Sequence, residues 1–423
     1  MNKKIIAICV VVLVLSAGAA LFFGGYFNRV NSSPDFTSAD LQNMTWDDVL
    51  AKAKGQTVNW YLWGGSQNVN NFLDNQVSQE AAKYGITINR VPLTDITIAI
   101  NKVAGEKQAG KNTDGSVDLV WINGANFMTM QQGKLLFGPW ASKVPNTALV
   151  NWNDATISYD MGYPVNGYES PWGSAQFQMI YDSAKYNVTD LPHNFAQLKT
   201  WVMAHPGRFT YDALPEFYGT TFIKEALYEL TGGYQQYESS NITLSQFTTM
   251  SAPLWDYLSA IKPYLWNQGK TYPASISDSY RMLSNGEIDM SMTFGGAGIA
   301  PTIKNGQLPS TAKVYCMATS IANTNYVAIP YNANAKAAAM VIANILLEPH
   351  MQAEFIRLTG NGAIINVSGL SASQAAEINN VMSSLPQGTY VPQDALAATR
   401  APDVSGYLAN YLRTLWDQKI NTS

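Results

Sequence analysis

The sequence predicts a two-lobed α/β protein, in which each lobe is a mostly parallel sheet flanked by helices and crossing strands join the lobes. Strand-like segments alternate with segments of helical length along most of the chain, which is the pattern of parallel βαβ units. The chain has 423 residues, of which 47% are hydrophobic. This length exceeds what one core usually holds and suits two lobes of roughly 200 residues each.

The first residues have the pattern of an export signal. Lys3 and Lys4 precede an unbroken apolar run (5–15) and a stretch of small residues, as in a signal peptide. The apolar character continues to about Phe27, which is long enough to cross a bilayer. We therefore expect 1–27 to be a signal peptide or an uncleaved N-terminal anchor. The protein would then act in the periplasm or at the outer face of the cytoplasmic membrane.

The composition excludes some classes of protein. The formal net charge is −4, so the chain lacks the basic character that nucleic-acid binding requires. Charged residues make up 13%, about half the usual share of a soluble domain. Such a surface suits an exported protein that binds neutral or mixed-polarity ligands. Cys9 lies in the apolar run and Cys316 is the other cysteine, so signal cleavage would leave no intramolecular disulfide.

The first lobe is expected to begin after a polar linker over 28–42. Apolar periodicity, propensity and the glycine and proline breaks predict its elements in order. They are a helix at 46–54 with Thr45 as its N-cap, strands at 57–63, 85–91 and 117–122, and helices at 69–84 and 94–105. We assign 43–179 to the first part of lobe 1.

An extended, alternating run over 168–182 predicts the strand that leaves the first lobe. We assign 180–312 to the second lobe, and 313–423 to a return to the first lobe with the C-terminal helices. The expected elements are helices at 194–204, 217–231, 253–266, 278–285 and 335–347, strands at 208–211, 288–294, 313–317 and 325–329, and a C-terminal helix with an apolar stripe through Leu408, Tyr411, Leu412 and Leu415.

Two predicted strands of the first lobe end in segments suited to ligand contact. In parallel sheets, ligands gather at the carboxyl ends of the strands. These ends combine aromatic rings, glycines and polar side chains at Trp63, Gly64, Gly65, Ser66, Trp121, Asn123 and Asn126. Each tryptophan could equally belong to the core, and each asparagine could cap the following helix. Capping and ligand contact are compatible, because a helix N-terminus also offers free amides.

The predicted crossing strand and the second lobe add further candidates for ligand binding. They are Trp172 and Gln176 on the strand, and Tyr211, Phe294 and Gly295 in the second lobe. Glu169 and Asp95 are the acids nearest the predicted cleft. Either would favour a cationic ligand flanked by aromatic faces, or could serve as a structural contact.

Motifs for catalysis are weak or missing. Segment 105–112 nearly fits the phosphate-binding loop, but a predicted helix precedes it and Asn112 stands where that loop needs a hydroxyl residue. His193, His205 and His350 have no partner at metal-ligand spacing, and no Gly-x-Ser-x-Gly elbow is present. Nothing marks a pair of carboxylates for glycoside hydrolysis. We expect no catalytic residue, metal site or cofactor, while a ferric site of tyrosines and carboxylates stays open.

Several stretches match a family of transport proteins. They are 58–66, 85–95, 101–127, 136–140 (LFGPW), 167–182, 205–211 (HPGRFTY) and 323–344. In these stretches the chain resembles the YnjB-like branch of ABC-transporter solute-binding proteins, within the type II periplasmic binding fold. The resemblance implies a ligand in the cleft between two lobes, with membrane permease subunits and a cytoplasmic ATPase as partners. It does not supply the ligand.

These observations lead to one functional hypothesis and two alternatives. We expect the extracytoplasmic solute-binding component of an ABC importer, a monomer that captures a small ligand by closure of its lobes and delivers it to a permease. The ligand would be partly aromatic or cationic, such as a thiamine-like compound or a polyamine. The alternatives are an extracytoplasmic carbohydrate-active enzyme such as a glycosidase, and a membrane-tethered scaffold protein.

Overall fold

The computed structural model describes residues 36–421, apart from 239–240 and 296–297. The expected export segment (1–27) and the first part of the expected linker lie outside the described residues. Residues 36–423 form one compact unit. Within the described part of the chain, no helix is both long and apolar enough to cross a bilayer.

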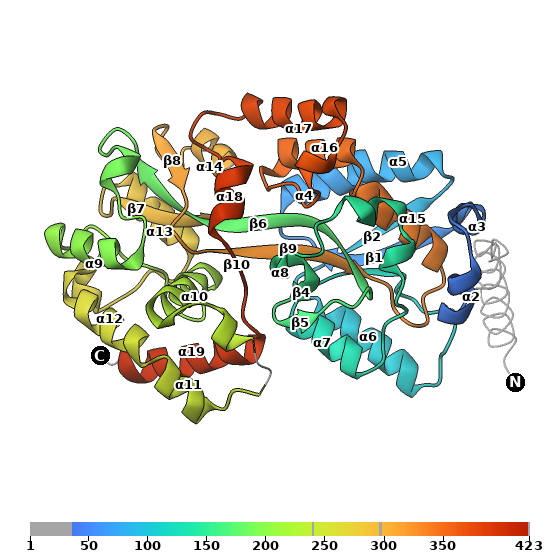
Figure 1. The fold of residues 1–423 in the computed structure, drawn as a ribbon, viewed down its shortest axis with the longest axis horizontal. Coiled ribbons are helices and arrows are strands. Elements are labelled where there is room, and N and C mark those ends of the chain that lie inside the picture. Colours follow the sequence, from blue (N-terminus) through green and yellow to red (C-terminus); the bar gives the residue numbers. More distant parts are fainter. Residues whose placement is uncertain (1–35, 239–240, 296–297, 422–423) are drawn as a thin grey trace, which may run out of the picture. The chain divides into compact units, whose positions relative to one another are not determined.

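Separate hydrophobic cores divide this unit into two lobes, joined by the crossing strands β6 (Glu169–Asp182) and β9 (Ser320–Ala328) (Figure 1). The first lobe contains α2 (Ser38–Asn43), α3 (Trp46–Ala53), β1 (Thr57–Trp63), α4 (Gln67–Phe72), α5 (Ser78–Lys83), β2 (Thr87–Leu93), α6 (Thr97–Gln108), β3 (Leu119–Ile122), α7 (Ala125–Gln132), α8 (Ala155–Ser158), β4 (Tyr159–Asp160), β5 (Tyr163–Pro164), α15 (Lys336–Leu346), α16 (Pro349–Thr359) and α17 (Ala372–Ser384). The second lobe contains α9 (Phe195–Ala204), α10 (Phe217–Thr231), α11 (Leu244–Met250), α12 (Ala252–Ile261), α13 (Ile276–Ser284), β7 (Met290–Phe294), α14 (Ile299–Lys304), β8 (Ala312–Tyr315), α18 (Gln393–Thr399), β10 (Arg400–Pro402) and α19 (Gly406–Lys419).

The crossing strands unite both lobes in one sheet of order β2-β1-β3-β9-β6-β7, with β8 paired to β6 and β10 paired to β9. Strand β1 pairs in parallel with β2 and β3, as the alternation of strands and helices predicts. Strand β9 is antiparallel to β3 and to β6. The two crossing strands, β6 and β9, therefore run between the lobes in opposite directions. The predicted two-lobed α/β class is confirmed, in a sheet of mixed strand directions.

Local sequence signals set the ends of several helices. The predicted cap of α3 is confirmed: the Thr45 hydroxyl accepts the N–H of Asp48, and the Asp48 carboxylate accepts the N–H of Thr45. This reciprocal pair satisfies donors that the first turn leaves free. Helix α10 ends at Gly232, whose φ of 94° is left-handed and favours a residue without a Cβ atom.

The C-terminal helix differs from its expected assignment to the first lobe. Leu408, Leu412 and Trp416 of α19 belong to the core formed by α9, α10 and α12 in the second lobe. Only part of 313–423 returns to the first lobe, because α15, α16 and α17 pack there while α18, β10 and α19 do not. An apolar stripe predicts that a helix face is buried, but it does not identify the partner that covers it.

Two other local expectations are corrected by the structure. The linker expected over 28–42 is shorter than predicted at its C-terminal end, because Phe36 and Leu41 are buried in the first-lobe core. The strand expected at 208–211 is unpaired chain in the described structure. Instead of strand pairing, this segment makes isolated backbone hydrogen bonds: the Trp266 N–H, for example, donates to the Phe209 carbonyl over 2.8 Å.

Asp118 connects the start of the chain with the segment that returns to the first lobe. Its side chain is buried and accepts the backbone N–H of Asn59 in β1 over 2.8 Å. It also accepts the N–H groups of Asn334 and Ala335, over 2.8 and 3.0 Å, just before α15. Burial raises the pKa of Asp118, and the N–H donors oppose this by stabilising the carboxylate. One side chain therefore fixes two segments that are far apart in sequence.

We expect Asp118→Ala to lower the free energy of unfolding by about 3 kcal/mol, because buried N–H groups would lose a charged acceptor. Urea unfolding followed by tryptophan fluorescence measures this loss. Asp256→Ala is the matched control, since Asp256 is exposed on α12, and it should change stability by less than about 0.5 kcal/mol. Equal effects of the two substitutions would contradict the structural role of Asp118.

Candidate functional site

The carboxyl ends of β1 and β3 lie at the junction of the two lobes. These strands are parallel, with Trp60 paired to Leu119, so they end at the same edge of the sheet. Asn123 follows β3 and donates from Nδ2 to the Asn323 side-chain oxygen over 3.1 Å. It also donates to the Thr324 carbonyl over 2.8 Å, on the crossing strand β9. The strand ends therefore meet the hinge directly.

An exposed tryptophan marks this edge on the first lobe. Trp63 is 46% exposed, and its ring packs edge-to-face on Trp121 with centroids 6.1 Å apart. Trp121 in turn packs on Trp172 at 5.0 Å. Trp172 is buried in the first-lobe core, so it lies behind Trp121 and supports it from the interior. Of these rings, Trp63 is the most exposed, Trp121 is half-buried and Trp172 is buried.

The turn after β1 explains how Trp63 is held. A Cβ atom on Gly65 would lie 2.1 Å from the Trp63 ring, so the indole can fold over this turn only because residue 65 is glycine. Gly64 allows a similar close approach to Pro92. The Ser66 hydroxyl accepts the N–H of Val69 and begins α4. The predicted cluster at 63–66 therefore consists of the exposed Trp63 ring and of the three residues after it, which position this ring.

The second lobe presents a comparable aromatic pair. Phe294 ends β7, and its ring stacks on Phe217 with centroids 4.9 Å apart and planes 27° apart. Phe217 is the first residue of α10 and is 45% exposed. Gly295, the residue after Phe294, is bound to the crossing strand β6, because its N–H donates to the Gln176 carbonyl over 3.0 Å. The pair on the second lobe is thus also anchored beside a crossing strand.

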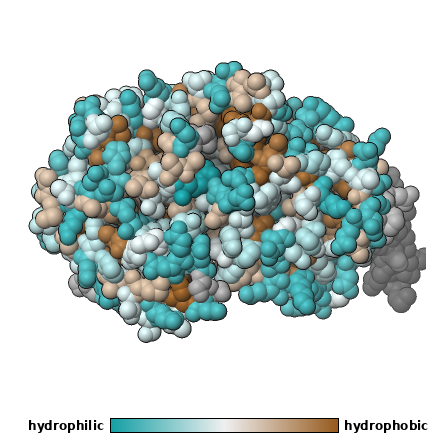
Figure 2. Space-filling model, in the orientation of Figure 1, coloured by the Kyte–Doolittle hydropathy of each residue, from teal (hydrophilic) through white to brown (hydrophobic). Residues whose placement is uncertain are grey.

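Few large apolar side chains remain exposed among the described residues. They are Trp63, Ile98, Tyr159, Met203, Phe217 and Leu244. On the face in Figure 2, hydrophobic patches are small and interrupted by hydrophilic residues. Single exposed apolar residues are normal. The aromatic members, however, all lie beside the junction of the lobes, where a ligand could cover them.

A hollow of about 740 Å³ opens between the lobes. It is lined by Asn68 of α4, by residues 300–305 around α14 and by the end of α16 near Gly360. This volume lies within the range of about 300–1,000 Å³ that is typical of small-molecule sites. The lobes approach closely nearby, since a Cβ on Gly295 would lie 2.2 Å from the Asn361 side-chain oxygen.

The two acids expected near the cleft differ in their burial. Glu169 is fully buried, its carboxylate oxygens have no hydrogen-bond partner in the described structure, and burial raises its pKa. Asp95 is exposed and accepts the N–H of Thr97 at the start of α6. Glu169 is therefore an interior residue, whereas Asp95 is exposed and comes two residues after Leu93, which pairs with Trp63.

A different pair of acids stands beside Phe217. Asp212 is buried, and burial raises its pKa to about 7, with Glu216 adding to the rise and a hydrogen bond from Ser279 opposing it. The Glu216 carboxylate is half-buried and accepts the N–H groups of Tyr218 and Gly219 at the start of α10. The sequence signal that could have indicated Glu216 is an acid immediately before a predicted helix whose first residue is aromatic.

The remaining predicted residues have structural contacts. Tyr211 is fully buried in the second-lobe core, and its hydroxyl accepts the Trp416 indole N–H over 3.1 Å. Gln176 is buried on β6 and donates to the Leu396 carbonyl over 2.9 Å. Asn126 is half-buried in the first turn of α7, with its N–H bonded to the Asn123 carbonyl. Over the residues described, no group of three His, Cys, Asp or Glu side chains could hold a metal ion.

Comparison with known proteins identifies the family. The model for bacterial extracellular solute-binding proteins matches residues 75–380. Protein YnjB of Escherichia coli (strain K12) is 37% identical over 309 residues, which cover 73% of this chain and 78% of YnjB. Such identity over most of both chains establishes common descent as well as a common fold.

Solved structures agree on the fold. An ABC transporter protein from Clostridium perfringens aligns with a TM-score of 0.62 at 14% identity, covering 86% of this chain and 100% of that one. The spermidine/putrescine substrate-binding protein PotD from Streptococcus pneumoniae aligns with a TM-score of 0.61 at 13% identity, covering 87% and 100%. The chain belongs to the bacterial extracellular solute-binding proteins, and it shares the type II periplasmic binding fold with these solved proteins of ABC transporters.

Proposed function

We propose that this solute-binding protein captures a small cationic or aromatic ligand between the Trp63–Trp121 pair of the first lobe and the Phe217–Phe294 pair of the second. The observation that carries the proposal is the exposure of one ring on each lobe, each packed on a second ring beside the hinge. Membership of an extracellular family implies an exported protein. Delivery would be to membrane permease subunits that a cytoplasmic ATPase drives.

Closure of the lobes would bring the two exposed rings onto a shared ligand. Hinge closure around a ligand is the usual motion of periplasmic binding proteins, and the paired strands β6 and β9 supply the hinge here. Flat faces on both lobes favour a planar or alkyl ligand of matching thickness. Asn123 and Asn323 lie beside the crossing strands and offer amide groups that fix its orientation.

Charge in the second lobe favours a cationic ligand. Asp212 and Glu216 lie together at the start of α10, next to the exposed ring of Phe217. A positive ligand would replace the proton that Asp212 otherwise holds near neutral pH, and aromatic faces attract cations in addition. Polyamines and thiamine-like compounds carry such charges. PotD, which has the same fold, is named for spermidine and putrescine.

A catalytic role has less support. The histidines make separate structural contacts: His193 bonds to the Val188 carbonyl, His205 stacks on Trp201, and His350 pairs with Glu377 on the surface. None lies beside the aromatic pairs. We therefore propose that the protein binds its ligand without chemical turnover, and we infer that it acts as a monomer that shuttles to the permease.

A thermal-shift screen against amines, thiamine-like vitamins, sugars and ferric iron tests the ligand class. A ligand that binds only the folded state raises the melting temperature, by an amount that grows with its concentration relative to the Kd. We expect shifts from cationic compounds and none from neutral sugars. A shift from ferric iron alone, or turnover of a carbohydrate, would overturn the proposal in favour of a metal carrier or a glycosidase. No shift with any compound would favour a scaffold.

We expect Trp63→Ala to weaken binding of the ligand found in this screen at least tenfold, which corresponds to about 1.4 kcal/mol. Isothermal titration calorimetry measures the loss. Met203→Ala is the matched control, because Met203 is 46% exposed on α9, away from the aromatic pairs. If both variants bind like the parent protein, the cleft at Trp63 is not the ligand site.

The raised pKa of Asp212, about 7, predicts a pH dependence. In the free protein, the folded state holds a proton that the unfolded chain releases near pH 4, so Asp212 should make stability fall as pH rises from about 4 through 7. A cationic ligand favours the carboxylate and must displace this proton below pH 7. Its affinity should fall by up to about tenfold per pH unit below 7, and should level off above it.

Calorimetry at pH 6 and pH 8 tests this dependence. Asp212→Asn removes the titrating group, so its affinity should become nearly independent of pH over the same range. Asp256→Asn, at an exposed site on α12, should retain the dependence of the parent protein. An affinity of the parent that is constant between pH 6 and 8 would show that the ligand does not interact with Asp212.

A further inference from the structure

Two consecutive glycines form the turn that carries the Trp63 ring. Glycine has more backbone freedom than any other residue, so Gly64 and Gly65 do not fix this turn by themselves. The indole lies over Gly65, where a Cβ atom would be 2.1 Å from the ring. The orientation of the ring therefore depends on contacts that hold the turn from outside.

Both backbone groups of Gly64 have such contacts. Its N–H donates to the Leu93 carbonyl of β2 over 3.0 Å. Its carbonyl accepts a hydrogen bond from Nδ2 of Asn70 over 2.9 Å. Asn70 belongs to α4, and only 9% of this residue is exposed. The neighbouring strand thus holds Gly64 from one side, and a buried amide holds it from the other.

Arg90 fixes the orientation of this amide. Its Nη1 donates to Oδ1 of Asn70 over 3.2 Å. Its Nε and Nη2 donate to the two carboxylate oxygens of Asp74, over 2.7 and 2.8 Å, and this bidentate pairing fixes the plane of the guanidinium. A guanidinium only donates and a backbone carbonyl only accepts, so one orientation of the Asn70 amide satisfies both neighbours. A chain of hydrogen bonds therefore runs from Asp74 at the surface to the Gly64 turn.

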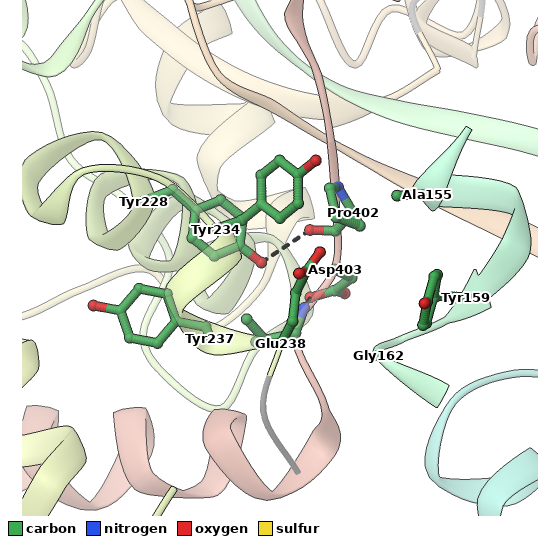
Figure 3. Close-up of a pocket in the computed structure, with 10 residues that line it drawn as sticks. Ala155, Tyr159, Gly162, Tyr228, Tyr234, Tyr237, Glu238, Pro402 and Asp403 are labelled. Carbon is green, nitrogen blue, oxygen red and sulfur yellow. Dashed lines mark hydrogen bonds between the residues drawn. The ribbon is translucent and has the colours of Figure 1, made fainter. Parts of the chain in front are cut away.

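The second lobe supports its exposed ring in another way. Phe217 is the first residue of α10, a helix that is largely buried. Further along this helix, the Tyr228 hydroxyl donates to the Pro402 carbonyl over 2.9 Å (Figure 3). A packed helix fixes the backbone of a ring at its end. Trp63 stands on a turn of glycines instead, so its backbone needs the support of side chains that reach the turn.

We propose that Asn70 and Arg90 are positioning residues for ligand binding, which hold the Gly64 turn so that the Trp63 ring is oriented before a ligand arrives. This inference rests on the proposed function, in which Trp63 contacts the ligand. A ring that is already held in place loses less conformational freedom on binding, which is how preorganisation raises affinity. The two residues act through the turn and do not touch the ligand.

Asn70→Asp separates the two contacts of this amide. An ionised carboxylate still accepts from Arg90, but it has no donor for the Gly64 carbonyl. Asn71→Asp is the matched control, because it adds the same charge at the next position of α4. Asn71 is exposed, and its oxygen accepts the Gln67 side chain rather than a group of the turn.

Fluorine NMR of protein labelled with 5-fluorotryptophan observes the ring without any ligand. The Trp63 signal is identified by its loss in Trp63→Phe. We expect Asn70→Asp to shift and broaden this signal and to leave the signals of the second-lobe tryptophans unchanged, while Asn71→Asp gives the spectrum of the parent protein. Arg90→Met, which removes the support of the amide, should shift the Trp63 signal in the same direction by a smaller amount.

The proposal is overturned if the Trp63 signal of Asn70→Asp matches that of the parent protein. Where this variant does not fold, a Trp63 signal of Arg90→Met that matches the parent overturns it instead.

Calorimetry with spermidine, a polyamine cation, tests the consequence for binding. Asn70→Asp should weaken spermidine binding about fivefold, the effect of one hydrogen bond, although its added negative charge by itself favours a cation. Asn71→Asp should bind like the parent protein. In a Trp63→Ala background, Asn70→Asp should have little further effect, because the ring that it positions is gone.

The two backgrounds distinguish positioning from a general structural role. Equal weakening with and without Trp63 overturns the positioning role, since the effect of Asn70 would then not pass through the ring. Failure of spermidine to bind the parent protein contradicts the cationic ligand of the proposed function. In that case the fluorine signal of Trp63, which requires no ligand, decides the positioning role by itself.

Discussion

The continuous pairing of β6 with β9 is the constraint on which the rest of the structure depends. The two strands remain in register from Glu169–Ala328 to Gln176–Ala322, with one irregularity at Pro171. Each strand has one half in the core of each lobe. Any motion of the lobes relative to each other must therefore twist or bend this pair.

A third connection braces this hinge on one side. Strand β10 pairs with β9, and its Arg400 donates to the Asp154 carboxylate at the start of α8 over 3.1 Å. The same guanidinium reaches the Gln176 side-chain oxygen over 3.3 Å. A second-lobe strand is thus tied to a first-lobe helix through charge-assisted bonds, which are stronger than neutral ones.

Local sequence predicted the parts of the fold and site that local chemistry decides. The β1 strand and its turn follow from β-branched and aromatic residues that precede Gly64 and Gly65, and this pattern alone puts Trp63 at the end of a strand. Contacts between distant segments could not be predicted in this way. Asn123 and Asn323 are 200 residues apart, and nothing in either segment identifies the other. For the same reason, the sequence suggested Glu169, which is buried, and missed Glu216, which lies beside the exposed Phe217.

The exposure of the rings explains why closure would depend on a ligand. An aromatic side chain buries about 150–250 Å² in a core, and Trp63 and Phe217 each have nearly half of their area in water. Covering that remainder stabilises a complex by roughly 2–3 kcal/mol per ring at about 25 cal/mol per Å². Because the rings stand on different lobes, a ligand on one lobe covers one ring in the open arrangement and gains the second contribution, about 2.5 kcal/mol, only in the closed one. A ligand can shift the lobes only by such a difference in affinity, and a difference of about 2.5 kcal/mol changes the ratio of closed to open molecules by roughly 70-fold.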